Sequence, residues 1–368
     1  MPERIVVKIG SSSLTSEEGG LNKERIGYFA GELAAQHAAG HAVMLVTSGA
    51  VAAGFRRIGY AARPKVVHEK QAAAAVGQAL LMQAYQEELG KYDIVVAQIL
   101  LTRADFSNRR RIQNALMTIE ELLKQRIIPI INENDTVSTD ELVPKFGDND
   151  NLSALVAAMT KASKLIIITD MDGLYTEDPR KNPEAVKIGR VEQISDDILR
   201  VAGGAGSSVG TGGMRSKIEA ARIAMRGGVG AFIGKVAHDG DLAAAVNGNG
   251  RGTYFDTNLH SLSMKKQWLG FHSMPQGRIT VDDGAVHALL VGGKSLLPAG
   301  VTESFGDYHP GDVVEVVNRQ GETLGRGVVN YTPWQLQASA GLSSEEVSRR
   351  VDVSRIEVIH RDEWVSLK

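Results

Sequence analysis

The stretch RIVVKIGSSS, residues 4–13, decides what fold to expect. Its first six residues are rich in β-branched side chains and lack the strict alternation of apolar and polar residues seen in half-exposed strands. Such a run is typical of a strand buried on both faces of a parallel sheet. A single lysine, Lys8, interrupts the run just before a Gly-Ser loop that begins at Gly10. The stretch therefore predicts a buried strand that ends in a polar loop.

Similar apolar runs recur along the first two thirds of the chain. They cover residues 42–46, 93–101, 127–131, 164–168, 229–233 and 253–255. Stretches with helical periodicity lie between the runs, at residues 23–38, 67–89, 108–124, 151–159 and 215–226. Alternation of strands and helices predicts an α/β domain with a mainly parallel open sheet sandwiched by helices.

The sequence pattern changes beyond about residue 257. Short β-like runs at residues 277–281, 313–317 and 323–329, broken by Gly every few residues, predict a small, mainly β barrel-like module. We expect an α/β domain at 1–257, a linker at 258–275, the β module at 276–353 and a C-terminal extension at 354–368. From residue 276 onward the chain has 9 Lys and Arg against 13 Asp and Glu, so this part is acidic.

Composition excludes several classes of protein. The 368 residues include no Cys, which rules out disulfide scaffolds, thiolate metal sites and Cys nucleophiles. The formal net charge of -2 gives no general electrostatic reason for nucleic-acid binding. No apolar run reaches the roughly 18 residues of a membrane span, and no secretory signal is visible. We expect a cytoplasmic protein that does not bind membranes.

Small and polar residues gather where the predicted strands end. They form the segments 10–13, 47–50, 132–135 and 169–170. In open α/β sheets, ligands bind outside the carboxyl ends of the strands. One such segment could be an ordinary turn, but four in succession predict a binding site.

Two lysine-bearing loops predict an anion site. Lys8 enters the loop at Gly10, and the Gly-rich stretch GSSVGTGGMRSK, residues 206–217, opens a helix with Lys217 in its expected first turn. Loop N–H groups and a helix N-terminus both favour phosphate. The spacing differs from a Walker A loop. Two non-functional alternatives are that Lys8 merely snorkels at the sheet edge and that residues 206–217 form a flexible surface loop.

The segment GDNDN, residues 147–151, alternates acids and amides. A Ca²⁺ loop is one interpretation, but the remaining EF-hand spacing is missing. Binding a substrate amine, or orienting a nearby lysine, uses these residues more economically. The nine His are scattered without paired ligand spacing, so no resident metal site is expected. Two lysines, Gly-rich loops and no evident general base favour phosphoryl transfer to an acid, because a carboxylate is already a nucleophile.

In this order and combination, the motifs resemble the amino acid kinase family over about residues 1–257. Residues 276–353 resemble a PUA domain. Within the kinase family, the set is most similar to the branch that phosphorylates glutamate. The motifs are KIGSS (8–12), TSGA (47–50), NEND (132–135), GDNDN (147–151), TD (169–170) with GLY (173–175), and TGGM to K (211–217).

The resemblance implies ATP-dependent phosphorylation of the L-glutamate γ-carboxylate, the first step of proline biosynthesis, with Mg²⁺ accompanying ATP. It implies that Lys8 and Lys217 neutralise the transferring phosphoryl group while Asp150 orients both ammonium groups. Backbone N–H groups of Gly10 and Gly49 would meet the phosphoryl oxygens.

The resemblance also implies two sets of binding residues. Those implied for glutamate are Ser48, Asn134, Asp135, Asp148 and Asn149. Those implied for the nucleotide are Lys8, Thr169, Asp170, Thr211, Gly212, Gly213, Met214, Arg215, Ser216 and Lys217.

Partners and alternatives follow from the same resemblance. Proline is the implied feedback inhibitor, and a homodimer or homotetramer is implied. PUA domains elsewhere bind RNA, but the acidic balance of residues 276–368 argues against it here. A related kinase acting on acetylglutamate, aspartate, carbamate or a nucleoside monophosphate stays open. Asp135 and the segment 148–150 favour a substrate with a free ammonium group.

Overall fold

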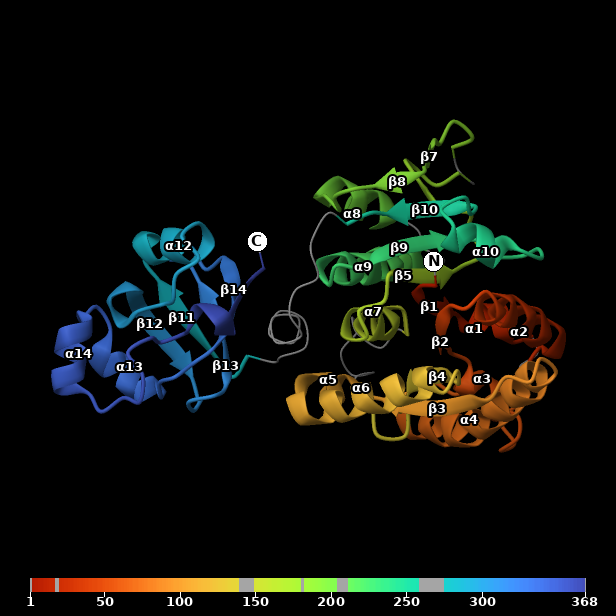
Figure 1. The fold of residues 1–368 in the computed structure, drawn as a ribbon, viewed down its shortest axis with the longest axis horizontal. Coiled ribbons are helices and arrows are strands. Elements are labelled where there is room, and N and C mark those ends of the chain that lie inside the picture. Colours follow the sequence, from red (N-terminus) through yellow and green to blue (C-terminus); the bar gives the residue numbers. More distant parts are fainter. Residues whose placement is uncertain are drawn as a thin grey trace. The chain divides into compact units, whose positions relative to one another are not determined.

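The computed structural model describes residues 2–16, 20–138, 149–179, 182–203, 211–257 and 275–367. The chain folds into two compact units, Met1–Asp105 with Arg110–Ser261 and Phe106–Arg109 with Leu262–Lys368. In the first unit, helices lie on both sides of a large sheet (Figure 1). None of the helices among the described residues is both long and apolar enough to cross a bilayer.

The sheet of the first unit has the strand order β3-β4-β2-β1-β5-β9-β10-β8. Neighbours from β3 through β9 run parallel, and β10 runs antiparallel to β9. The expected open, mainly parallel sheet is therefore confirmed. The strands are β1 (Arg4–Ile9), β2 (Ala42–Val46), β3 (Val96–Leu101), β4 (Ile128–Glu133), β5 (Lys164–Ile168), β8 (Arg190–Val191), β9 (Gly230–Gly234) and β10 (Gly252–Phe255).

The helices form two layers. α2 contacts both α4 and α10 in one layer, and α9 contacts both α7 and α8 in the other. The helices are α1 (Ser11–Leu14), α2 (Lys23–Ala38), α3 (Ala50–Gly54), α4 (Val67–Gly90), α5 (Arg103–Ser107), α6 (Arg109–Lys124), α7 (Asn149–Met159), α8 (Asp196–Gly203), α9 (Thr211–Arg226) and α10 (Asp241–Val246). A small hairpin joins β6 (Leu174–Tyr175) to β7 (Lys187–Ile188).

Several element boundaries differ from the sequence-based expectation, among them the starts of β3, α7 and α9. β3 begins at Val96 rather than at residue 93, because Asp93 adopts a left-handed φ of 57° that ends the preceding turn. α7 begins two residues early, at Asn149, and α9 begins four residues early, at Thr211. The low helix propensity of Gly212 and Gly213 conceals the start of α9 in the sequence. Lys217 consequently lies in the second turn of α9, not the first.

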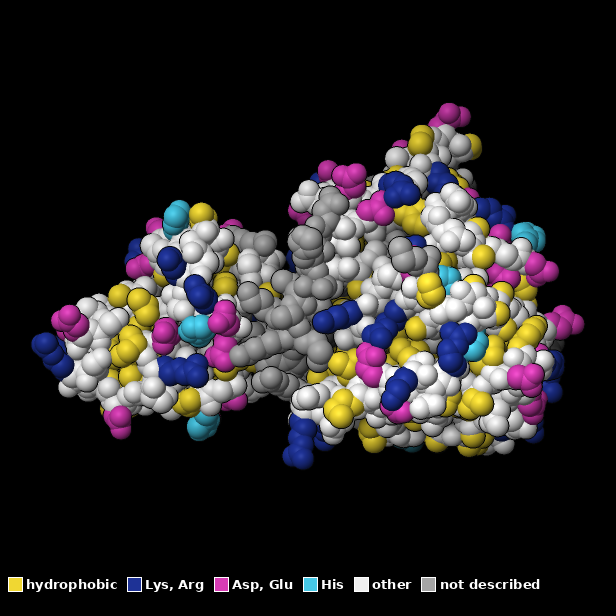
Figure 2. Space-filling model, viewed as in Figure 1, with side chains coloured by type: hydrophobic (Ala, Val, Ile, Leu, Met, Phe, Trp, Pro, Cys, Tyr) yellow, Lys and Arg dark blue, Asp and Glu magenta, His cyan; other side chains and the backbone are white. Residues whose placement is uncertain are grey.

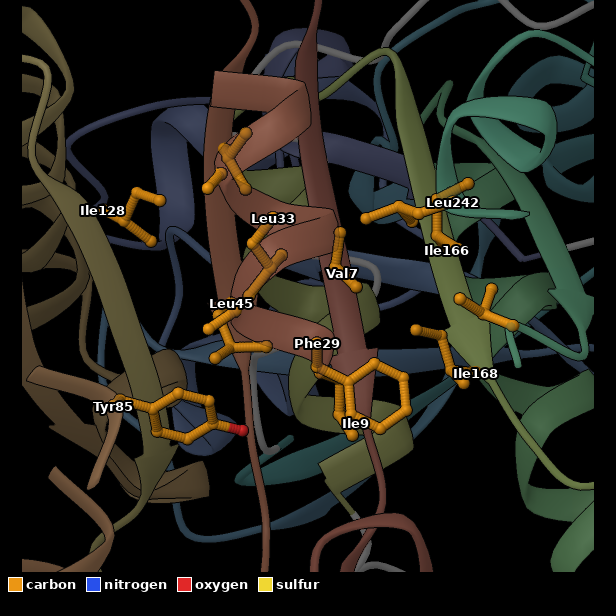
Figure 3. Packing of buried hydrophobic residues seen from close by; sticks show 14 of the residues in the cluster. Val7, Ile9, Phe29, Leu33, Leu45, Tyr85, Ile128, Ile166, Ile168 and Leu242 are labelled. Atoms are coloured by element: carbon orange, nitrogen blue, oxygen red, sulfur yellow. The ribbon is translucent and has the colours of Figure 1, made fainter. Parts of the chain in front are cut away.

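One hydrophobic core lies between the sheet and the layer of α2 and α4 (Figure 3). Ile5, Val7 and Ile9, alternate residues of β1, are fully buried in it. Phe29 and Leu33 of α2 pack against them. Burying a side chain of this size contributes about 1.5–3 kcal/mol, so this layer stabilises the position and direction of β1.

Lys8 points to the other face of β1, because successive side chains of a strand alternate. That face is covered by α7. Lys8 is only 4% exposed. A buried ammonium group is costly without a negative partner, so α7 must supply one.

Two glycines allow α3 and α4 to pack backbone to backbone. A Cβ on Gly54 would lie 1.9 Å from the carbonyl oxygen of Ala73, and one on Gly77 would lie 1.8 Å from that of Ala50. Neither position tolerates any side chain without movement of the backbone. This contact holds the helix that follows Ser48 and Gly49 firmly against the middle of α4.

The second unit has a five-stranded sheet in the order β12-β11-β13-β14-β15. Its own core includes Ile279, Val316, Tyr331 and Trp364. The strands are β11 (Gly277–Val281), β12 (Val301–Gly306), β13 (Val313–Val317), β14 (Thr323–Val328) and β15 (Trp364–Ser366), and the helices are α12 (Asp283–Leu290), α13 (Pro333–Ser339) and α14 (Ser344–Arg350). Basic and acidic side chains are interspersed on its visible face (Figure 2).

Candidate active site

The register of the parallel strands brings the polar segments to one edge of the sheet. Lys8 pairs with Val46 of β2, Val46 pairs with Ile131 of β4, and Lys8 pairs with Ile167 of β5. The segments that follow these four strands therefore leave the sheet at the same level. Carboxyl ends of parallel strands are where α/β proteins bind ligands.

A buried carboxylate joins the two lysines at this edge. Asp150, in the first turn of α7, has no exposed side-chain surface. Its Oδ1 lies 2.5 Å from Lys8 Nζ, and its Oδ2 lies 3.2 Å from Lys217 Nζ. Each carboxylate oxygen thus holds one ammonium group. The three side chains together carry a net charge of +1, which suits them to an anionic ligand.

The two lysines keep Asp150 ionised. Burial by itself would raise the pKa of this carboxyl group, but the charges of Lys8 and Lys217 outweigh burial and hold the pKa below its ordinary value. A hydrogen bond from Ser216 acts in the same direction. The carboxylate is therefore a permanent anchor for both ammonium groups near neutral pH.

α9 contributes two side chains to this cluster. Ser216 Oγ donates to Asp150 Oδ2 at 2.8 Å, and Lys217 Nζ donates to the carbonyl oxygen of Gly213 at 3.1 Å. Lys217 is thereby tied both to α7 and to its own helix. Its ammonium group is positioned before any ligand arrives.

Asn149 forms a second cluster beside the first. Its Nδ2 lies 2.8 Å from the carbonyl oxygen of Thr47, 2.7 Å from Ser48 Oγ and 3.0 Å from Asn132 Oδ1, and its two hydrogens are shared among these three acceptors. Its Oδ1 is buried and has no hydrogen-bond partner among the residues that the structure describes. An acceptor left in this state is costly unless a ligand donates to it.

The first turn of α7 divides the site into two halves. Successive residues of an α-helix point about 100° apart, so Asn149 and Asp150 cannot face the same neighbours. Asn149 faces the ends of β2 and β4, whereas Asp150 faces β1 and α9. One half thus offers amide and hydroxyl groups, and the other half offers two ammonium groups.

Gly10 and Gly49 lie at the starts of the loops after β1 and β2. A Cβ on Gly10 would be 3.4 Å from Lys8 Nζ, so this loop passes directly beside the ammonium group. Gly49 has a φ of 105°, a left-handed conformation that favours glycine. Gly10 is half-buried and Gly49 is buried, and neither carries a Cβ that would keep a ligand from its backbone.

The other expected site residues occupy turns at the same edge. Asn134 follows β4 and accepts a hydrogen bond from Thr136 at 2.6 Å, and the adjacent Asp135 is half-buried. Thr169 follows β5 and donates to Asp170 at 3.0 Å. Met214 and Arg215 lie on α9, whereas Asp148 and the side chain of Thr211 lie outside the described residues. Among the residues that are described, no group of three or more His, Asp or Glu side chains could hold a metal ion.

Residues 3–235 match the amino acid kinase family, and residues 277–351 match the PUA domain. The chain belongs to the amino acid kinase family. An amino acid kinase domain followed by a PUA domain is the order that the sequence motifs indicated. The site described above lies wholly within the kinase match.

Curated relatives align along the whole chain. The glutamate 5-kinase of Geobacillus kaustophilus (strain HTA426) is 51% identical over 367 residues, covering 100% of this chain and 98% of the relative. That of Bacillus cereus (strain ATCC 10987 / NRS 248) is 49% identical over 366 residues, covering 99% of each. A solved carbamate kinase from Giardia lamblia bound to AMP-PNP is 17% identical with a TM-score of 0.49, covering 70% of this chain and 99% of that one.

Three amides of this amino acid kinase site were not among the residues predicted from the sequence. Asn132 lies within the NEND motif, Gln78 lies on α4, and Gln98 lies on β3. A glutamine inside the apolar strand 96–101 was the available signal. The contacts of Lys8, Asp150, Ser216 and Lys217, and those of Ser48 with Asn149, bring these predicted residues together. Their roles toward substrates stay predictions.

Proposed function

We propose that this chain catalyses the ATP-dependent phosphorylation of the γ-carboxylate of L-glutamate, forming L-glutamyl 5-phosphate for proline biosynthesis. The observation that carries this proposal is the ion-paired cluster of Lys8, Asp150 and Lys217. Two ammonium groups held by one buried carboxylate can neutralise the negative charge of a migrating phosphoryl group. Curated relatives named glutamate 5-kinase, at about half identity over the full chain, support the choice of substrate.

In the proposed reaction, a γ-carboxylate oxygen of glutamate attacks the γ-phosphorus of ATP. The new O–P bond forms as the bond to the β-phosphate oxygen breaks, and ADP leaves. Lys8 and Lys217 neutralise charge on the migrating group, and the N–H groups of Gly10 and Gly49 donate to its oxygens. These interactions act chiefly in the transition state, where negative charge is spread over the attacking carboxylate, the migrating phosphoryl group and the leaving ADP.

We propose that Mg²⁺ enters with ATP as the counter-ion of its phosphate oxygens, so that the nucleotide substrate is MgATP. Thr169, Asp170 and the start of α9, Thr211–Lys217, are the proposed nucleotide contacts. They border the lysine half of the site, which supports this placement. In this placement, Lys8 and Lys217 contact the phosphates rather than the base or the ribose.

The amide half of the site is the proposed glutamate subsite. Asn149 Oδ1 would accept from the substrate ammonium group, and Ser48 would donate to a carboxylate. Asn134, Asp135 and Asp148 complete the proposed set. The unpartnered acceptor on Asn149 supports a substrate that carries N–H donors.

The test is to trap the acyl phosphate with hydroxylamine. We expect a hydroxamate when the full chain is incubated with ATP, Mg²⁺ and L-glutamate. N-acetyl-L-glutamate, which lacks the free ammonium group, should give far less. Equal turnover of both acids would redirect the proposal to a related kinase, and no product with either would reject it.

Proline and self-association complete the proposal. Proline shares the ammonium and α-carboxylate of glutamate, so we propose that it inhibits by overlapping the amide half of the site. The same hydroxamate assay with added proline tests this. We also propose a homodimer or homotetramer, because α4 leaves Ala72, Ala75, Val76 and Ala79 exposed beside the edge strand β3.

RNA binding by the second unit is not part of the proposal. Its affinity would rest on Lys and Arg contacts to phosphates. Residues 276–368 contain more acidic than basic residues, and the two kinds are interspersed on the visible face (Figure 2). A structural or regulatory role fits this charge pattern better.

A further inference from the structure

Asn149 stands at the end of a chain of side-chain amides that reaches the edge of the sheet. Asn149 Nδ2 donates to Asn132 Oδ1 at 3.0 Å, and Asn132 Nδ2 donates to Gln78 Oε1 at 2.8 Å. Gln78 Nε2 in turn donates to Gln98 Oε1 at 2.9 Å. Each amide nitrogen therefore donates to the oxygen of the next amide, and the polarity of the chain runs one way.

This polarity decides how Asn132 and Asn149 are oriented. If the Asn132 amide were reversed, its NH₂ group would face the NH₂ group of Asn149 and its oxygen would face the oxygen of Gln78. Its NH₂ group would also face the backbone N–H of Glu133, which donates to Asn132 Oδ1 at 2.9 Å. Three hydrogen bonds would therefore be replaced by three repulsive contacts. The acceptor on Gln78 and the N–H group of Glu133 therefore select, from opposite ends of the amide, the Asn132 orientation that offers an oxygen to Asn149.

This orientation of Asn132 fixes the orientation of Asn149, the last amide in the row. Because Asn149 Nδ2 is held by Thr47, Ser48 and Asn132, its Oδ1 points away from these three acceptors. That buried oxygen has no partner among the described residues. It is thus preset to accept from an N–H donor on the substrate.

Gln78 itself is held in a rigid place. The adjacent Gly77 packs against the backbone of α3, with space for no Cβ, and α3 directly follows Ser48 and Gly49. The backbone of Gln78 and the loop that carries Ser48 are therefore fixed to each other. Because α4 and this loop do not shift relative to each other, a side chain on α4 can fix the orientation of hydrogen-bonding groups in the site.

We propose that Gln78 is a positioning residue for the acceptor substrate: its amide oxygen orients Asn132, which orients Asn149 toward the substrate ammonium group. This inference rests on the proposed function and adds a specificity-determining residue to it. Gln78 touches no substrate in this account and acts only through Asn132. Its loss should weaken glutamate binding while leaving ATP binding unchanged.

The test compares three substitutions at position 78 in the full chain. Gln78→Met is of similar length but removes the acceptor, and we expect the KM for glutamate to rise about 3- to 10-fold, the effect of one lost hydrogen bond. Gln78→Glu keeps the acceptor and should stay near the unaltered value. Gln78→Lys offers only donors and should be at least as impaired as Gln78→Met. In all three, the KM for ATP should change less than about twofold.

Gln83→Met is the matched control on the same helix, because Gln83 is exposed and donates to Glu87 one turn away. It should leave both KM values unchanged. If Gln78→Met does not fold, as judged by thermal denaturation, the contrast between Gln78→Glu and Gln78→Lys decides.

Two outcomes would count against the proposal in different ways. Hydroxamate formation with unchanged KM values in every variant, or with ATP and glutamate affected alike, overturns the role of Gln78 alone. No hydroxamate from the unaltered chain overturns the proposed function and this inference with it.

Discussion

Lys8, Asp150 and Lys217 come from three elements, β1, α7 and α9, and meet in a space closed to solvent on the carboxylate side. Side chains alternate along β1, so Lys8 points away from the apolar core. The helical periodicity of α7 directs Asp150 toward Lys8. At the residue scale, the site is therefore preorganised by its own ion pairs.

Lys217→Ala should lower kcat by about 10²- to 10³-fold, because removing one preorganised charge removes stabilisation of the transition state. The KM for glutamate should change little, since the charge lies in the phosphoryl half. Steady-state kinetics with both substrates varied measures this. Lys124→Ala, an exposed lysine on α6, is the control. An unchanged kcat would remove Lys217 from the mechanism.

The lowered pKa of Asp150 predicts a specific pH behaviour. A carboxyl group whose pKa is lower in the folded state than in the unfolded state stabilises the fold at pH values above its ordinary pKa of 3.8. That stabilisation is lost as the pH falls through the lower pKa of the folded state. The ratio of kcat between the unaltered chain and Asp150→Asn should therefore be flat from about pH 5.5 to about pH 8.5. A ratio that shrinks toward pH 6 would show that Asp150 takes up a proton there.

At the scale of elements, buried strands were the easiest to predict. β1, β2 and β5 have the predicted bounds, because continuous β-branched runs have few alternative structures. The starts of α7 and α9 were missed, since Asn, Asp and Gly also form loops. The amides Gln78 and Asn132 could not be paired from sequence, because 54 residues separate them and only the packing of α4 brings them together.

Gly77 and Gly90, both on α4, should respond oppositely to the same change. Gly77→Ala places a Cβ 1.8 Å from the carbonyl oxygen of Ala50 and should destabilise the fold by at least about 1–3 kcal/mol. Gly90→Ala meets no atom within 4 Å and should be neutral or stabilising by up to about 1 kcal/mol. Thermal denaturation compares them. Equal midpoints would contradict the close packing of α3 on α4.

At the scale of the whole molecule, the exposed face of α4 predicts self-association. Apolar residues at 72, 75, 76 and 79 share one face of this helix and remain exposed. Ala75→Arg should lower the mass seen by sedimentation velocity, because a charge without a partner is costly in an apolar interface. Gln86→Arg, an exposed change further along α4, should leave the mass unchanged. The same large mass for both variants would place the interface elsewhere.

In the proposed mechanism, the phosphoryl group passes directly from ATP to a carboxylate oxygen held beside Lys8 and Lys217. Glutamate labelled with ¹⁸O in its γ-carboxylate tests this claim most directly. Hydroxylamine attacks the acyl carbon of the product, so the phosphate it releases keeps the oxygen that attacked phosphorus. We predict that each released phosphate carries one ¹⁸O atom from glutamate. Phosphate with no label would mean that water, not the carboxylate, receives the phosphoryl group.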